Sequence, residues 1–209
     1  MRFSPFLARR SLLGLALTLP VLAATPALAA NPAEAYVADN IHKGLDILNN
    51  KGLSTAQRRS QFEGFLLGLT DMHRIALFTL GQYRRTASHE DQEAFAAAFQ
   101  NYAVAVYQSY FSKYAGQTLK VTGSTARNTH DYVVTTAMID PHDSSQQPLE
   151  VDFRVLTDSG KPVVVDVAVA GIWLSLEERD QFTAFLGQNG GNIHLLISHL
   201  GELAKQFKS

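Results

Sequence analysis

The spacing of apolar residues changes at Thr118, and this change limits the possible folds more than any other feature of the chain. Residues 32–114 repeat apolar side chains every three or four positions, as helices do, whereas residues 119–171 alternate with a period of two, as strands do. Helical spacing returns over residues 175–203. Helices, then a meander of strands, then helices is typical of an α+β domain. We therefore predict a curved antiparallel four-stranded sheet with helices packed on one face.

The strand-like region divides into four runs joined by short polar links, which favour antiparallel hairpins. The runs are residues 119–127, 132–140, 149–157 and 163–171. Capping signals mark helix starts at Ser54, Ser88 and Ser175, each followed three residues later by Gln or an acidic residue. Asp71 is also predicted to cap a helix.

The first 29 residues have the pattern of an export signal. Arg2, Arg9 and Arg10 form a basic start, an apolar stretch follows, and Ala27-Leu28-Ala29 is a small-x-small cleavage site. The arginine pair resembles a twin-arginine signal but also occurs in ordinary secretory signals, so both export routes stay open. Cleavage after Ala29 leaves residues 30–209 as a single domain. This part has 15 basic and 19 acidic side chains, which disfavours nucleic acid as a partner.

Residue patterns for catalysis or metal binding are weak. The seven His residues include no HExxH pair, and there is no Cys to act as ligand or nucleophile. Asp166 is the carboxylate that most resembles a candidate general base, because it lies within the valine-rich run 163–169. Alternation places Asp152, Arg154 and Asp166 together on the face away from the core, where they would form cross-strand ion pairs. We therefore predict no catalytic residue, no metal and no cofactor.

Two separated groups of motifs resemble the MlaC family of periplasmic phospholipid-binding proteins. The first comprises Asp71-Met-His-Arg-Ile-Ala76, Leu80-Gly-Gln-Tyr83 through Ser88, and Glu93 to Phe99; the second comprises Val151-Asp-Phe-Arg154, Val165-Asp-Val167, Gly171-Ile-Trp-Leu174, Gln181-Phe182 and Asn189-Gly-Gly191. Tyr83 stands where the family commonly has Trp, and Lys161-Pro162 departs from its usual start of the last strand.

The resemblance implies a monomeric, soluble carrier in the periplasm. Such a carrier moves phospholipid between an outer-membrane lipoprotein–porin complex and an inner-membrane MCE-domain ABC transporter. Its acyl chains would occupy a cavity between sheet and helices, with the headgroup outside. Some members of the family are associated with hopanoids, so a hopanoid or another apolar lipid is the alternative cargo.

Side-chain parity and helical spacing give the candidate cavity residues. One wall would be the sheet face, the other would come from the helices, and two aromatic residues would lie near the mouth. The sheet wall is Val151, Phe153, Val155, Val165, Val167 and Val169; the helical wall is Phe78, Phe99, Val106, Tyr110, Phe182 and Phe185; the mouth residues are Tyr107 and Trp173.

Two other functions compete with the carrier. An enzyme acting on an apolar substrate would use Asp166 or Asp71 as a general base, and it predicts a carboxylate inside the cavity. A protein that acts only by docking to partners predicts a filled core instead, because apolar stripes usually fill cores.

Overall fold

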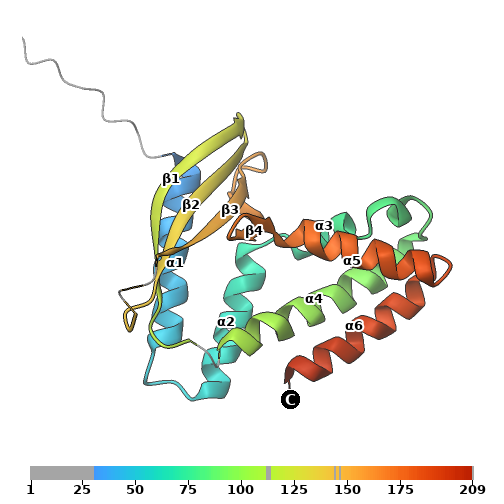
Figure 1. Cartoon of the computed structure of the whole chain (residues 1–209), viewed down its shortest axis with the longest axis horizontal. Helices are drawn as coiled ribbons and strands as arrows, with labels where there is room; N and C mark the ends of the chain where they lie inside the picture. Colours follow the sequence, from blue (N-terminus) through green and yellow to red (C-terminus); the bar gives the residue numbers. More distant parts are fainter. Residues whose placement is uncertain (1–30, 112–113, 144, 146, 209) are drawn as a thin grey trace, which may run out of the picture.

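The computed structural model describes residues 31–111, 114–143, 145 and 147–208, and its helices and strands follow the predicted order (Figure 1). The predicted export signal and its cleavage site lie outside the described residues. The helices are α1 (Pro32–Asn49), α2 (Thr55–Leu69), α3 (Met72–Thr79), the 3-10 helix η1 (Gly81–Arg85), α4 (His89–Phe111), α5 (Leu174–Gln188) and α6 (Ile193–Lys208). The strands are β1 (Thr118–Asn128), β2 (Asp131–Ile139), β3 (Leu149–Leu156), β4 (Val163–Val169) and β5 (Ile172–Trp173).

The sheet is antiparallel throughout, with its strands in chain order from β1 to β5. It confirms the predicted α+β fold with one strand more than expected. The extra strand, β5, follows a tight turn in which Ala170 and Gly171 have φ values of 51° and 80°. This turn lets the chain pair back onto β4 for two residues before α5 begins.

The N-terminal helix covers one face of the sheet. Ala33 and Val37 of α1 pack against Val134, Val155 and Val164, which come from β2, β3 and β4. Figure 1 shows α1 running along the strands, with α2 returning beside it. This cluster, which we call the sheet core, closes one end of the molecule.

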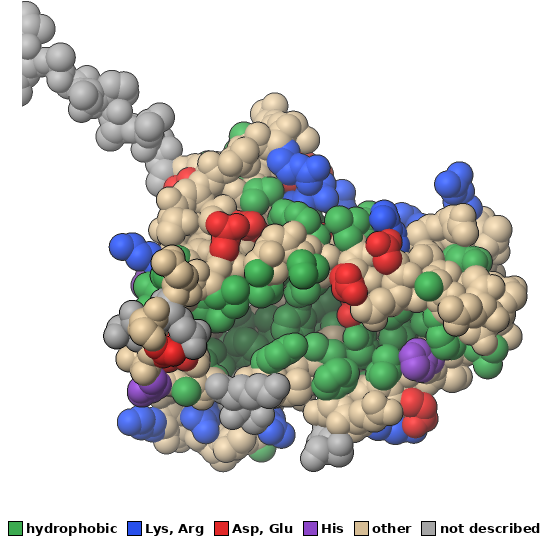
Figure 2. All heavy atoms as spheres, in the orientation of Figure 1, with side chains coloured by type: hydrophobic (Ala, Val, Ile, Leu, Met, Phe, Trp, Pro, Cys, Tyr) green, Lys and Arg blue, Asp and Glu red, His purple; other side chains and the backbone are tan. Residues whose placement is uncertain are grey.

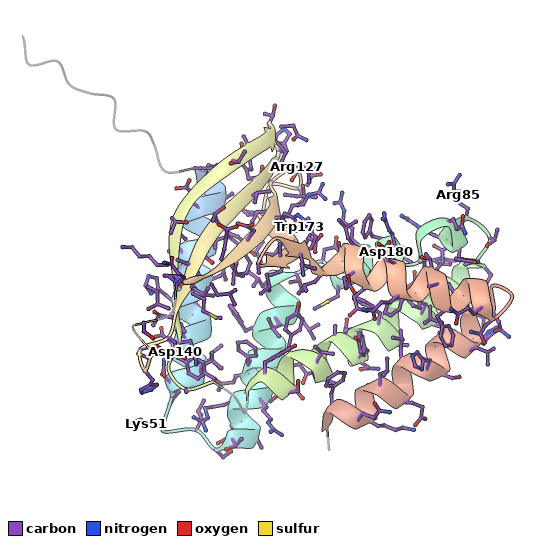
Figure 3. The ribbon with its side chains drawn as sticks, viewed as in Figure 1. Lys51, Arg85, Arg127, Asp140, Trp173 and Asp180 are labelled. Atoms are coloured by element: carbon purple, nitrogen blue, oxygen red, sulfur yellow. The ribbon has the colours of Figure 1, made fainter. Side chains whose placement is uncertain are left out.

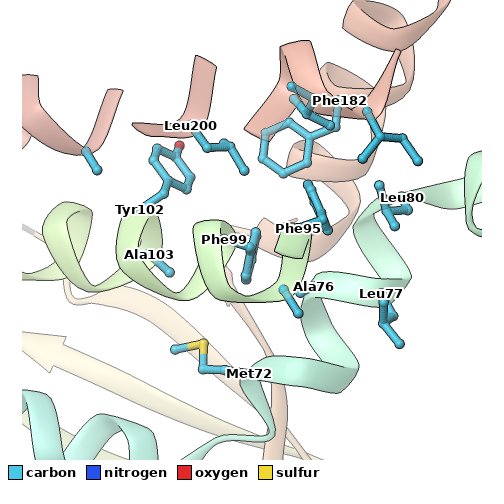
Figure 4. Packing of buried hydrophobic residues seen from close by; sticks show 14 of the residues in the cluster. Met72, Ala76, Leu77, Leu80, Phe95, Phe99, Tyr102, Ala103, Phe182 and Leu200 are labelled. Atoms are coloured by element: carbon cyan, nitrogen blue, oxygen red, sulfur yellow. The ribbon is translucent and has the colours of Figure 1, made fainter. Parts of the chain in front are cut away.

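A second and larger cluster, the helical core, lies among α3, α4, α5 and α6 (Figure 4). Phe182 of α5 is its centre, with its ring edge-on to Phe95 and Phe99 at centroid distances of 6.0 and 6.2 Å. Helices α4 and α6 pack against each other along their length, and Figure 1 shows them extending away from the β4 end of the sheet. The two cores are joined near Val164, whose carbonyl accepts a hydrogen bond from the Asp71 amide at 3.3 Å.

A bulge between β3 and β4 changes the predicted side-chain parity. Phe153 pairs with Val167 and Arg154 with Asp166, but the next pair is Val155 with Val164, so Val165 has no partner on β3. Val164 therefore joins the sheet core in the place predicted for Val165. Alternation fails at this point because a bulge inserts one residue and reverses the faces beyond it.

The surroundings of Asp166 differ from the prediction that it lies on a face away from the core. It shares a face with Arg154, as expected, but that face is covered at β4, and only 8% of Asp166 is exposed. Its carboxylate accepts hydrogen bonds from the Ser175 amide (3.1 Å), the Ser175 hydroxyl and its neighbour's amide at Val167 (2.9 Å). Ser175, the predicted N-cap, therefore lies inside α5, which begins at Leu174 after Trp173. The amide of Ser175 is capped by Asp166 from the adjacent strand instead. Arg154 instead pairs with Asp131, at 2.9 and 3.0 Å.

Candidate binding cavity

A large open hollow of about 930 Å³ lies between the sheet and the helices. Its wall is mainly apolar, and Figure 2 shows hydrophobic side chains lining a hollow in the centre of the face between these two parts. The wall consists of Leu48, Phe62, Tyr107, Tyr110, Tyr114, Gln117, Met138, Ile139, Asp140, Pro141, Asp143, Gln147, Pro148 and Leu149. The volume lies near the upper end of the range of about 300–1,000 Å³ for pockets that bind small molecules.

The large hollow forms where several elements end. Leu48 lies at the end of α1, Tyr107 and Tyr110 near the end of α4, and Ile139 at the end of β2. The β2–β3 connection supplies polar groups at one side, and Figure 3 shows Asp140 there. Its carboxylate accepts hydrogen bonds from Gln117 (3.1 Å) and the His142 amide (2.8 Å), which together lower the pKa of Asp140.

A second, smaller hollow of about 280 Å³ shares the rings of Tyr107 and Tyr110 with the large one. It lies against α3, α4, α5, α6 and β4. Its remaining wall consists of Thr70, Met72, Ile75, Phe99, Tyr102, Ala103, Val106, Val164, Asp166, Val167, Leu174, Ser175, Glu178 and Phe207.

Five of the fourteen predicted site residues line these hollows. Tyr107 and Tyr110 line both, while the small hollow adds Phe99, Val106 and Val167. Tyr110 is 60% exposed, so its ring lies open beside the large hollow.

The other nine predicted residues lie away from both walls. Val155 and Phe153 belong to the sheet core and Phe182 to the helical core, while Phe185 stacks on His199 at 4.8 Å. Phe78 faces outward, with the Arg179 guanidinium 5.2 Å from its ring centroid.

The remaining four predicted residues belong to the sheet. Val151 and Val165 are buried and Val169 is partly buried in it. Trp173, labelled in Figure 3, pairs with Ala168 where the sheet meets α5. Lipid contact by these residues stays a prediction.

The small hollow combines its apolar wall with buried polar groups. The Tyr102 hydroxyl donates a hydrogen bond to Glu178 Oε1 at 2.9 Å, and burial raises the pKa of both groups. Burial also raises the pKa of Tyr107 to about 12, with further contributions from the nearby Asp166 and Glu178 carboxylates. Each of these groups is therefore held in a medium that disfavours a change to its charged form.

Sequence reasoning missed most of the cavity wall. Leu48, Phe62 and Met138 have the same periodic placement as the core residues beside them, so nothing local distinguishes them. Glu178 has a weak signal, since it is an acidic residue in the first turns of a predicted helix. That signal predicted that Glu178 helps to cap the helix. In the structure Asp166 of β4 caps the helix instead, and Glu178 lines the small hollow.

Two features are absent from the described residues: a cluster of metal ligands and a membrane-spanning helix. No group of three His, Cys, Asp or Glu side chains lies close enough within them to hold a metal ion. None of the helices in the described part of the chain has the length and apolarity needed to cross a bilayer. The large hollow lies beside two filled cores, the sheet core and the helical core.

An antiparallel sheet and a layer of helices with a large, open apolar hollow between them define an α+β ligand-binding domain. The MlaC protein family matches residues 38–202, and the chain therefore belongs to the MlaC family. A similar solved structure is a phospholipid-binding protein from Ralstonia solanacearum in complex with a phospholipid. It superposes with a TM-score of 0.73 at 22% identity, covering 85% of this chain and 99% of that chain, and confirms the fold. No curated protein matches the chain in sequence.

Proposed function

We propose that the protein is a periplasmic carrier that holds the acyl chains of a phospholipid in the large hollow. Membership of the MlaC family supports this function, and so does the phospholipid complex described for the similar Ralstonia protein. The carrier would pass its lipid between an inner-membrane MCE-domain ABC transporter and an outer-membrane lipoprotein–porin complex. It would thereby help to maintain the lipid asymmetry of the outer membrane. The predicted export signal supports the periplasmic location.

The observation that carries the proposal is the exposed apolar surface of the large hollow. Tyr110, Ile139 and Leu149 all line it and are 60%, 41% and 37% exposed. Large apolar patches on a soluble protein usually mark a binding site. A ligand lying in the hollow would cover these side chains.

The energetics explain why a lipid needs such a carrier. Burial is worth about 0.8 kcal/mol per methylene, so two chains of about 15 methylenes would cost about 24 kcal/mol in water. A carrier has to replace nearly all of this with an apolar environment. Binding alone accomplishes that, so the proposed function requires no covalent step and no cofactor.

The competing enzyme hypothesis expects a carboxylate in the cavity, and Asp166 does line the small hollow. Its hydrogen bonds to Val167 and Ser175, however, account for it as the cap of α5. Asp71, the other candidate base, accepts a hydrogen bond from the Arg74 amide at 2.9 Å and caps α3. We therefore propose a non-enzymatic carrier.

Native mass spectrometry of protein purified without detergent tests the proposal directly. We expect one phospholipid to co-purify, and lipid-free protein to take up phospholipid from vesicles. Protein that co-purifies with a hopanoid and takes up no phospholipid from vesicles would favour a hopanoid as the cargo. Protein that neither retains nor takes up any lipid would contradict the carrier function. Transfer of labelled lipid to vesicles containing the transporter complex then tests the proposed route.

A further inference from the structure

Apart from the two tyrosines that it shares with the large hollow, the small hollow has polar side chains that are bonded within the protein. The Ser175 amide and hydroxyl bond to Asp166, and the Tyr102 hydroxyl donates to Glu178 Oε1 at 2.9 Å. The other oxygen of Glu178 is shielded from solvent and presents almost no surface to a ligand. The Thr70 hydroxyl donates to a main-chain carbonyl of α2 at 2.8 Å. A ligand in the small hollow therefore meets mainly the apolar part of its wall.

The small hollow is elongated along one face of α4. The residues that α4 contributes recur at intervals of three or four, which places them on one face: Phe99, Tyr102, Ala103, Val106, Tyr107 and Tyr110. From Tyr110 back to Phe99 the helix rises by about 16 Å, at about 1.5 Å per residue. The facing wall comes from α3, α5, α6 and β4. This shape and lining suit a hydrocarbon chain, which binds because its methylenes are removed from water.

The small hollow meets the large one at one end and stops at the helical core at the other. Tyr107 and Tyr110 line both hollows, so the junction lies at this pair of rings. At the opposite end Phe99 packs edge-on against Phe182 at 6.2 Å, and both belong to the helical core. A close-packed core leaves no room for a chain to continue. The small hollow is therefore a blind extension of the large one.

The two volumes set how much chain each hollow can hold. A methylene is close in size to a water molecule, which takes about 30 Å³. The large hollow of about 930 Å³ then holds about 30 methylenes, or two chains of about 15. The small hollow of about 280 Å³ holds about nine more, enough for the end of one chain.

We propose that the small hollow binds the end of one acyl chain, so that the protein limits the lengths of its two chains unequally. The inference rests on the proposed carrier function and adds a chain selectivity to it. One chain ends within the large hollow at about 15 methylenes, whereas the other passes Tyr107 and Tyr110 and reaches about 24. The headgroup stays outside, at the open side of the large hollow. A phospholipid with one very long chain would fill both hollows.

Photo-cross-linking locates the chain end in the unmodified protein. The probe is a phosphatidylglycerol with one palmitoyl chain and one lignoceroyl chain that carries a diazirine near its end. Lipid-free protein takes up the probe from dioleoyl phosphatidylglycerol vesicles and is irradiated. Mass spectrometry of its peptides should find the label between Phe99 and Val106 on α4 and on Phe207. A matched probe with the diazirine near the ester should instead label the large hollow, at Met138 or Leu149.

Two results of this experiment would overturn the inference and leave the carrier function intact. One is a chain-end label confined to the wall of the large hollow. The other is the absence of any chain-end label in protein that has taken up the probe, since a chain end in water reacts with water. Protein that takes up no lipid at all would refute the carrier function itself.

Filling the small hollow tests the length limit. Dioleoyl phosphatidylglycerol vesicles contain equal amounts of dipalmitoyl and palmitoyl-lignoceroyl phosphatidylglycerol, and native mass spectrometry counts the lipids bound. Val106→Phe narrows the small hollow. Its bound ratio of long to short lipid should fall about tenfold or more below that of the unmodified protein, because each methylene left in water weakens binding about fourfold. The cost of leaving the vesicle cancels in this comparison.

Ala97→Phe is the matched control, because Ala97 lies on the exposed side of α4 and lines neither hollow. It should keep the ratio of the unmodified protein. An unchanged ratio in folded Val106→Phe protein would contradict the length limit. The cross-linking result decides the matter even if that variant fails to fold.

Discussion

Replacing Asp166 with Ala should destabilise the fold strongly, although Asp166 lies on a strand and the helix it caps begins eight residues later. Asp166→Ala removes the acceptor of three hydrogen bonds and leaves the Ser175 amide and hydroxyl buried without a partner. Three bonds to a charged acceptor at about 1.5 kcal/mol each give about 4.5 kcal/mol. Because the bonds share one carboxylate and are not independent, we expect a loss of about 3 kcal/mol in the free energy of unfolding.

Urea unfolding followed by far-UV circular dichroism measures this loss, and the neighbouring strand offers a control. Asp152 of β3 pairs with Ala168, two residues along β4 from Asp166, but its Oδ1 atom is buried without a hydrogen-bond partner among the described residues. Asp152→Ala should therefore change stability by less than about 1 kcal/mol. The cap assignment is wrong if Asp166→Ala costs no more than Asp152→Ala. It is also wrong if Ser175→Ala, which removes one of the three bonds, costs as much as Asp166→Ala.

Three further results are expected. Phe182→Ala empties the centre of the helical core and should lower the free energy of unfolding in urea by about 3–5 kcal/mol. Leu195→Ala, on the exposed side of α6, should lower it by less than about 1 kcal/mol. Similar losses for the two variants would contradict the packing in Figure 4. Burial raises the folded-state pKa of Glu178, so its contribution to stability is fully present below the unfolded pKa and is lost as the pH rises through the folded pKa. The stability of Glu178→Gln relative to the unmodified protein should therefore increase as the pH rises above the usual glutamate pKa of about 4.3, and a pH-independent difference would argue against this burial. Met138→Arg places a charge in the wall of the large hollow and should reduce phospholipid uptake from vesicles about tenfold or more. Thr125→Arg, on the exposed part of β1, should leave uptake unchanged. Equal uptake by the two variants would mean that the acyl chains bind elsewhere.

The sequence predicts most of the secondary structure because periodicity and caps act locally. The run from Leu149 to Val155 alternates between apolar and polar residues, and β3 ends within one residue of the prediction. The capping box at Ser54 also forms as predicted, with Gln57 bonding back to the Ser54 amide. The bulge at Val165 could not be predicted, because the register of β4 depends on its pairing with β3 and not on the sequence of β4 alone.

The cavity was predictable in kind but not in its residues. Phe99 and Phe182 belong to neighbouring helices and have similar apolar surroundings in the sequence, yet Phe99 reaches the small hollow while Phe182 fills the helical core. The difference depends on how α4, α5 and α6 pack, which local spacing does not specify. The same packing buries Asp166, since only the arrival of α5 over β4 covers that face.

The separation of the sheet core from the helical core has a consequence for how a bulky ligand could enter and leave. Each core is packed mainly within its own set of elements, although α2 contributes Leu67 to the helical core and Leu69 to the sheet core, and the large hollow lies where the two sets meet. Close-packed cores resist deformation, so a relative movement of the two sets would be expected to occur about their junction at β4, where Val164 contacts Thr70 and Asp71 and Asp166 binds Ser175. Such a hinge would widen or narrow the opening without unpacking either core. The protein could then admit and release a molecule much larger than any fixed mouth would allow.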